Sequence, residues 1–142
     1  MKRFKRWRQL PRQEKRLLIE AVLCLFWVRL LFGLVPLSLA LRLVGSRPGE
    51  NDAGLIAEDK AAAIARALAR AARHVPFRAR CLQQAFAGFL MLRRRGLKAS
   101  VHMGVRREPD STLAAHAWSL SGATPVTGQA EAAGYVPIAC FT

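Results

Sequence analysis

A cysteine and a histidine occupy positions at which they could form a nucleophilic pair. Cys81 opens a predicted helix and follows two arginines, Arg78 and Arg80. Free N–H groups at a helix N-terminus and neighbouring cations stabilise the thiolate, the nucleophilic form of cysteine. His116 lies in the middle of a predicted strand, and a histidine on a strand that faces the helix can act as the base for such a thiol. A Cys–His dyad is one interpretation; a small buried cysteine and a hydrogen-bonded core histidine are the alternatives.

The other cysteines and histidines have simpler interpretations. Cys24 and Cys140 lie in apolar runs, which are typical of buried cysteines. His102 lies in the preceding predicted strand and competes with His116 as the base, whereas His74 is expected to be a charged cap at the end of a helix. Three widely spaced cysteines fit neither a disulfide scaffold nor a structural zinc site, so we expect no structural metal.

Helices are predicted ahead of both candidate residues. An apolar helix over 17–35 should end at Pro36, and a short helix over 37–44 follows it. Residues 53–75 are rich in alanine, the strongest helix former. A further helix over 81–95 would carry Cys81 at its first residue and end at a glycine that follows three arginines.

Strands are predicted after the helices. The apolar residues alternate over four short stretches, and Pro137 in the last of them favours an edge position. These stretches are 99–105, 113–120, 124–127 and 135–141. Helices followed by an antiparallel meander predict the α+β class, with the cysteine-bearing helix packed on a small sheet.

The length and the composition indicate how many domains the chain can form. The chain has 142 residues, of which 52% are hydrophobic, so it is the size of one folded domain. A turn-rich stretch over 46–52 divides it into a basic tail with apolar helices, 1–47, and a candidate catalytic core, 53–142.

The net charge of +14 raises the question of an anionic partner. Eight of the 23 Lys and Arg residues lie within the first 16 residues, and no helix-turn-helix, zinc-finger or RNA-binding motif accompanies them, so no nucleic-acid partner is expected. The apolar stretch over 17–35 is long enough to span a membrane but contains Glu20 and Arg29. Residues 1–45 therefore fit either a helical layer over the core or a partner, or a segment in contact with a membrane surface.

Four motifs in their order and spacing resemble the lasso-peptide leader peptidase family, the stand-alone protease form of the lasso peptide biosynthesis B protein. These motifs are Cys81-Leu82, Arg94-Arg95-Gly96, Gly104-Val105 and His116-Ala117-Trp118. The resemblance covers about residues 65–142, and the apolar helices before it resemble the front half of the family. It implies a transglutaminase-like, papain-like cysteine protease core of ribosomal peptide biosynthesis, whose hydrolysis needs no metal and no cofactor.

The resemblance also implies a role for each matching residue. Cys81 would be the nucleophile, its backbone N–H part of the oxyanion hole, and His116 its base. Trp118 would wall the site or pack in the core. Many family members carry an Asp after the His that orients the imidazole, but this chain has none there. Glu131, Gln129 or a backbone carbonyl would have to replace it. Arg78, Arg80 and Leu82 would form the environment of the substrate and the oxyanion.

The partners implied by the resemblance follow from the pathway of the family. The substrate would be a precursor peptide of leader and core, presented by a separate leader-recognition protein, and an ATP-dependent, asparagine-synthetase-like cyclase would use the product. We expect a cytoplasmic protein, either free or peripheral to the inner face of the cell membrane. A non-enzymatic membrane-associated protein and a small nucleic-acid-binding protein are the alternatives that the basic composition leaves open.

Overall fold

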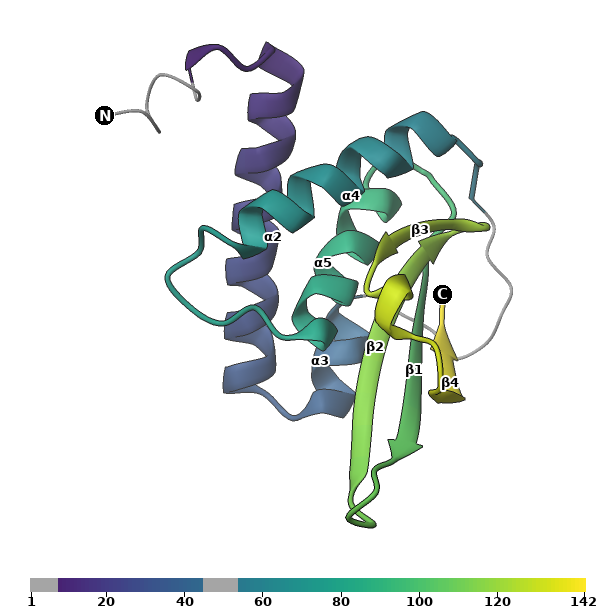
Figure 1. The fold of residues 1–142 in the computed structure, drawn as a ribbon. Coiled ribbons are helices and arrows are strands. Elements are labelled where there is room, and N and C mark those ends of the chain that lie inside the picture. Colours follow the sequence, from purple (N-terminus) through teal and green to yellow (C-terminus); the bar gives the residue numbers. More distant parts are fainter. Residues whose placement is uncertain (1–7, 45–53) are drawn as a thin grey trace.

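Helices pack against one face of a four-stranded antiparallel sheet (Figure 1). The computed structural model describes residues 8–44 and 54–142; the predicted linker over 46–52 and the first seven residues of the basic tail lie outside them. The helices are α2 (Arg12–Leu34), α3 (Leu37–Val44), α4 (Glu58–Ala72) and α5 (Cys81–Arg93). The remaining elements are the strands β1 (Ser100–Arg107), β2 (Leu113–Ser121), β3 (Thr124–Thr127) and β4 (Val136–Phe141), with the 3-10 turn η1 (Gln129–Glu131) before β4. The predicted α+β class is confirmed.

The apolar helix α2 belongs to the hydrophobic core. Pro36 follows its end, as predicted, and α3 begins directly after the proline. Ala21, Leu25 and Val28 on α2 are completely buried, and α2 packs against both α4 and α5. The predicted domain boundary falls among residues that the structure does not describe, while the core on either side of it is continuous.

The helices α4 and α5 begin and end for identifiable reasons. α4 starts five residues later than predicted, because Leu55 forms a parallel bridge with Leu97 instead of joining the helix. Gly54 permits this close approach, since a Cβ atom there would lie 2.3 Å from the backbone nitrogen of Lys98. α5 begins at Cys81, as predicted, and is followed by Gly96 with a φ of +64°, the left-handed conformation that glycine adopts most easily.

The sheet has the strand order β3-β2-β1-β4. β1, β2 and β3 form the predicted meander, but β4 does not continue it. The chain instead returns past η1 and pairs β4 with β1, which places Pro137 on an edge strand, as predicted. In the pairing of β1 with β2, Gly104 lies opposite His116 and His102 opposite Trp118.

The two faces of the sheet differ in what covers them. Ser119 on β2 faces α5, because a Cβ atom on Gly88 of that helix would lie 3.0 Å from its hydroxyl oxygen. Phe141 on β4 likewise contacts the ring of Phe86 on α5. Side chains alternate along a strand, so His116 and Trp118 project from the opposite face.

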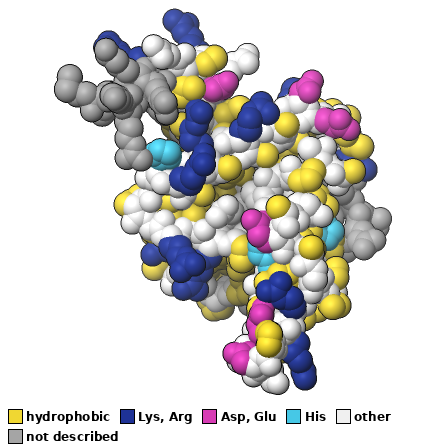
Figure 2. All heavy atoms as spheres, in the orientation of Figure 1, with side chains coloured by type: hydrophobic (Ala, Val, Ile, Leu, Met, Phe, Trp, Pro, Cys, Tyr) yellow, Lys and Arg dark blue, Asp and Glu magenta, His cyan; other side chains and the backbone are white. Residues whose placement is uncertain are grey.

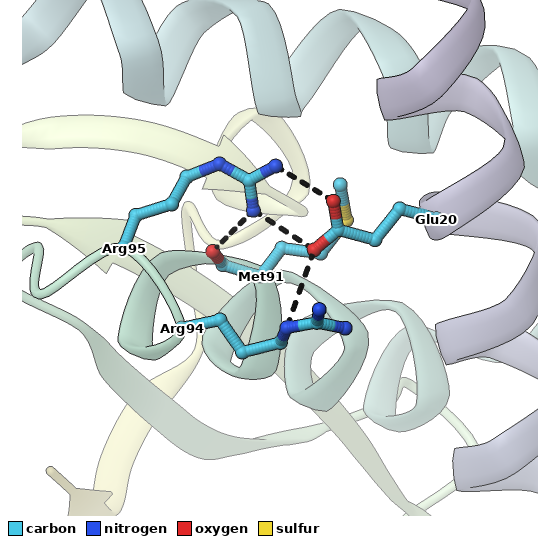
Figure 3. A network of polar contacts seen from close by, with 4 residues as sticks. All are labelled: Glu20, Met91, Arg94 and Arg95. Atoms are coloured by element: carbon cyan, nitrogen blue, oxygen red, sulfur yellow. Dashed lines mark hydrogen bonds and ion pairs between the residues drawn. The ribbon is translucent and has the colours of Figure 1, made fainter.

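An ion pair joins α2 to the end of α5 (Figure 3). Arg95 donates two hydrogen bonds to the carboxylate of Glu20, at 2.8 Å and 2.6 Å, and a third to the carbonyl oxygen of Met91 at 2.9 Å. The Nε of Arg94 lies 3.8 Å from the same carboxylate. Glu20, which is unfavourable in an apolar helix of this kind, is therefore paired at the point where α2 crosses α5.

We predict that Glu20→Gln lowers the free energy of unfolding by roughly 1.5–3 kcal/mol, the range for a hydrogen bond to a charged group. The hydrogen bond from Arg95, the largest of the causes, lowers the pKa of Glu20 below its ordinary value of 4.5. The contribution of this pair to stability is thus present above about pH 4.5 and is lost as the pH falls through the lowered pKa. Urea unfolding of the protein and the variant between pH 3 and pH 7 measures the difference. Glu14→Gln, at an exposed position of the first turn of α2, is the control, and an equal loss in both variants would contradict the role of the pair.

Candidate active site

Cys81 is the first residue of α5, and its own helix fixes the first turn. The side-chain oxygen of Gln83 accepts a hydrogen bond from the backbone N–H of Arg80 at 3.1 Å. The side-chain amide of Gln84 donates to the carbonyl oxygen of Ala79 at 2.8 Å. The two glutamines after the cysteine therefore hold the chain just before it, and the half-buried thiol lies where helix N–H groups have no partner within the helix.

The loop that leads to Cys81 is fastened to α2. The ring of Phe77 packs edge-on against Phe26, with 5.0 Å between the ring centroids. The guanidinium of Arg29 lies over the same ring, 4.6 Å from its centroid. Arg29 is thus accommodated in the apolar helix by a cation–π contact, and α2 helps to position the N-terminus of α5.

His116 on β2 is oriented by a backbone carbonyl. Its Nε2 lies 2.8 Å from the carbonyl oxygen of Gly128, the residue that follows β3. A carbonyl oxygen can only accept a hydrogen bond, so Nε2 carries the proton. In the neutral imidazole this leaves the lone pair on Nδ1, the nitrogen that is then free to take a proton. Of the three groups that the sequence left open for this role, the structure has the backbone carbonyl.

Only glycine fits at position 128 without displacing this hydrogen bond. Gly128 has a φ of +66°, which side chains other than glycine rarely adopt. A Cβ atom there would lie 2.8 Å from the carbonyl oxygen of Ala117 and 3.0 Å from Nε2 of His116. The close approach of this turn to β2 depends on the absence of a side chain.

Aromatic rings surround the imidazole. Trp118, with only 6% of its surface exposed, is stacked near His116 at 6.0 Å between ring centroids. The ring of Tyr135 lies 5.3 Å from His116 and is itself covered by the guanidinium of Arg106 at 4.6 Å. Figure 2, which views the sheet side, shows histidine side chains at the surface on this face. Trp118 is therefore buried and also lies beside the imidazole of His116.

The structure brings Cys81 and His116 onto two contacting elements but does not join them. α5 packs against β2, yet on the face opposite to the one from which His116 projects. Among the described residues, Cys81 forms no hydrogen bond with His116 or with any other side chain. Catalytic hydrogen bonds are often long in the absence of substrate and tighten when it binds.

The remaining predicted site residues lie around these two. Arg78 and Arg80 are exposed in the loop before α5, and neither forms an ion pair within the part of the chain that the structure describes. Leu82 is half-buried and packs against the core. Glu131 is exposed in η1 and makes no hydrogen bond to the ring of His116 among the described residues.

The other histidines are engaged elsewhere. His102 also stacks on Trp118, at 5.8 Å between ring centroids, and its Nε2 lies 3.1 Å from the hydroxyl of Ser100 and 4.0 Å from the sulfur of Cys140. His74 hydrogen bonds through Nδ1 to the carbonyl oxygen of Arg70 one turn earlier. Across residues 8–44 and 54–142, no group of three or more His, Cys, Asp or Glu side chains is placed to hold a metal ion.

The arrangement of these elements agrees with a family comparison. The model of the transglutaminase-like superfamily matches residues 21–140, and the chain belongs to this superfamily, which includes cysteine peptidases. The match begins inside α2 and thus includes the helix that anchors the loop before Cys81. No curated protein and no solved structure matches the chain.

The thiols should differ in reactivity. Burial, as the largest cause, raises the pKa of the Cys24 thiol to about 11, so that it stays protonated at neutral pH. Cys81 is more accessible and lies at a helix N-terminus. We predict that iodoacetamide at pH 7.5 modifies Cys81 at least about tenfold faster than Cys24. Peptide mapping by mass spectrometry measures both rates; modification of Cys24 first would contradict this assignment.

The orientation of His116 predicts a specific tautomer. Nitrogen-15 NMR of the protein should show His116 protonated at Nε2, and Gly128→Ala should abolish this preference because a methyl group would displace the ring. Gly96→Ala is a matched control: its φ of +64° imposes a similar backbone strain, but no atom lies within 4 Å of the added methyl. Equal behaviour of the two variants would show that the effect is strain alone.

Proposed function

We propose that this protein is a cysteine peptidase that removes the leader from a lasso-peptide precursor. Membership of the transglutaminase-like superfamily supports the peptidase chemistry. The observation that carries the proposal most directly is the hydrogen bond from Nε2 of His116 to Gly128, which leaves Nδ1 as a proton acceptor. The motif resemblance over residues 65–142 supports the narrower substrate class.

In the proposed mechanism the thiol and the histidine act in sequence. Nδ1 of His116 takes the proton from the sulfur of Cys81, and the thiolate attacks the carbonyl carbon of the scissile peptide bond. The oxygen of the tetrahedral intermediate accepts a hydrogen bond from the backbone N–H of Cys81, which lies at the start of α5 and has no acceptor within the helix. The C–N bond then breaks, and His116 returns the proton to the amine of the released core peptide.

Water completes the proposed reaction. His116 removes a proton from a water molecule, which attacks the thioester carbon of the acyl-enzyme, and the thiol leaves with that proton. The products are a leader with a free carboxylate and a core peptide with a free N-terminal amine. That amine is the group that an ATP-dependent cyclase would join to a side-chain carboxylate, so the reaction class fits the expected partner.

The dyad has one geometric requirement. Cys81 belongs to α5, which packs on one face of β2, whereas the side chain of His116 projects from the other face. The two side chains can therefore meet only around the edge of this strand. The turn at Gly128, which holds the ring, lies next to Ala117 on the side of β2 that carries β3. We propose that a bound substrate segment brings the sulfur and Nδ1 within hydrogen-bond reach at this edge.

Cleavage of a synthetic precursor, in the presence of a separate recognition protein, tests the proposal. Cys81→Ala and His116→Ala should each lower kcat by at least roughly 10²–10⁴-fold, which is the rate contribution of general acid–base catalysis. Gly128→Ala should lower kcat more than Glu131→Gln does, because the carbonyl and not the carboxylate orients the ring. Gly96→Ala should retain the rate.

The mass of the products distinguishes the reaction types. Hydrolysis yields a leader acid and a core amine, whereas transfer to an added amine, the reaction of transglutaminases, yields a leader amide. A precursor without its leader should not be cleaved. Full activity of Cys81→Ala or His116→Ala would overturn the peptidase assignment; cleavage of unrelated peptides at an equal rate would overturn only the substrate class.

A further inference from the structure

One face of α2 is apolar, and no other part of residues 8–44 and 54–142 covers it. Its side chains follow helical spacing and are large, from Leu23 to Trp27 at 57% exposure and Leu34 at 79%. The opposite face of the same helix is buried in the core. On the helix that follows Pro36, α3, further leucines are exposed and extend this surface. The α2–α3 apolar face consists of Ile19, Leu23, Trp27, Leu30, Leu34, Leu37, Leu39 and Leu43.

Cations border this face at the N-terminal end of α2. Arg12 and Arg16 precede Ile19 at helical spacing and lie on the same side of the helix. A groove of about 480 Å³ runs between α2 and α5, with Trp27 among its apolar walls and Arg16 and Arg94 among its lining residues. The side chain of Arg94 is 69% exposed.

The acid in this groove does not neutralise the border. Glu20 lines the groove and is bound in two hydrogen bonds by Arg95, with Nε of Arg94 a further 3.8 Å away. A single carboxylate cannot neutralise the cations Arg16, Arg94 and Arg95, so a net positive charge remains at this border for an anionic ligand. In the sequence, eight of the 23 Lys and Arg residues lie within the first 16 residues, next to this end of α2.

We propose that the α2–α3 apolar face docks the protein on an anionic membrane surface, with α2 lying along the surface. Apolar and aromatic side chains would enter the boundary between headgroups and acyl chains, and the cations would contact lipid phosphates. From Ile19 to Leu34 the helix face is about 22 Å long at 1.5 Å per residue, a continuous strip that suits a fluid surface. This inference is independent of the peptidase reaction.

The packing of α2 favours lying on the membrane rather than crossing it. By length and composition α2 could span a bilayer, with a mean hydropathy of 2.2 over its apolar window. To span, however, it would have to leave the core, exposing Ala21, Leu25 and Val28 and breaking the pair of Glu20 with Arg95. A helix that keeps one face on the protein and turns the other to lipid retains both the buried side chains and the ion pair.

The charge distribution disfavours a second copy of the chain as the occupant. Two molecules with a net charge of +14 each would bring their cation-bordered faces together, and like charges oppose such an approach. Anionic lipid, by contrast, supplies both the apolar phase and the countercharge.

Sedimentation with vesicles tests the proposal. The full chain should bind vesicles of equal parts phosphatidylglycerol and phosphatidylcholine at least about tenfold more tightly than vesicles of phosphatidylcholine alone, and 0.5 M NaCl should weaken binding. The triple variant Leu23→Gln, Trp27→Gln, Leu30→Gln should lose at least about tenfold in affinity. The matched control, Leu113→Gln, Val136→Gln, Ile138→Gln, removes three exposed apolar side chains from the sheet and should bind as the wild type does.

Fluorescence locates the bound face independently of any change in stability. In a Trp7→Phe background, lipids brominated on the acyl chains should quench Trp27 and spare the buried Trp118. Circular dichroism verifies that the variants remain folded. Unchanged binding of the triple variant, equal loss in the control, or no quenching of Trp27 would overturn the proposal. A stable dimer that shields Trp27 without vesicles would overturn it in favour of a second copy.

Discussion

The contact of α2 with α4 and α5 is the interaction on which the rest of the structure depends. α2 supplies completely buried side chains to the core. It also contacts the chain just before and just after α5. Glu20 binds Arg95 beyond the end of α5, while Phe26 and Arg29 hold Phe77 in the loop before its start. A shift of α2 would therefore move both ends of the helix that carries Cys81. The superfamily match begins inside α2 and includes Phe26 and Arg29, which hold the loop before Cys81.

The second constraint is the turn at Gly128, and it has a chemical consequence. A carboxylate that orients a histidine carries a full charge and can itself take a proton, whereas a carbonyl has a partial charge and does not titrate. The carbonyl of Gly128 fixes the tautomer of His116 at every pH at which the ring is neutral. It also stabilises an imidazolium less than a carboxylate would. In the proposed mechanism, His116 therefore returns its proton to the leaving amine more readily than a histidine held by a carboxylate would.

Local signals in the sequence are sufficient for the helices and for all four strands. Pro36 and Gly96 end elements where predicted, and the alternation around His116 identifies β2. The pairing of β4 with β1 cannot be predicted, because it joins residues 31 to 40 positions apart and leaves no local pattern. The Glu20–Arg95 pair spans 75 positions, so the sequence alone assigns the three arginines only to a helix end. The sequence leaves open which group orients His116; the choice of Gly128 depends on how the chain leaves β3, which the sequence does not encode locally.

The composition of α2 follows from what surrounds it. A helix that is apolar on nearly all sides needs apolar surroundings on nearly all sides, and the core covers only one face of α2. Its two charged residues within the apolar stretch illustrate the rule: Glu20 is satisfied by Arg95 and Arg29 by the ring of Phe77, both on the protein side. The opposite side carries leucines and Trp27, and no described residue covers them. An apolar phase outside the protein, bordered by negative charge, is the environment that we propose for this remaining face.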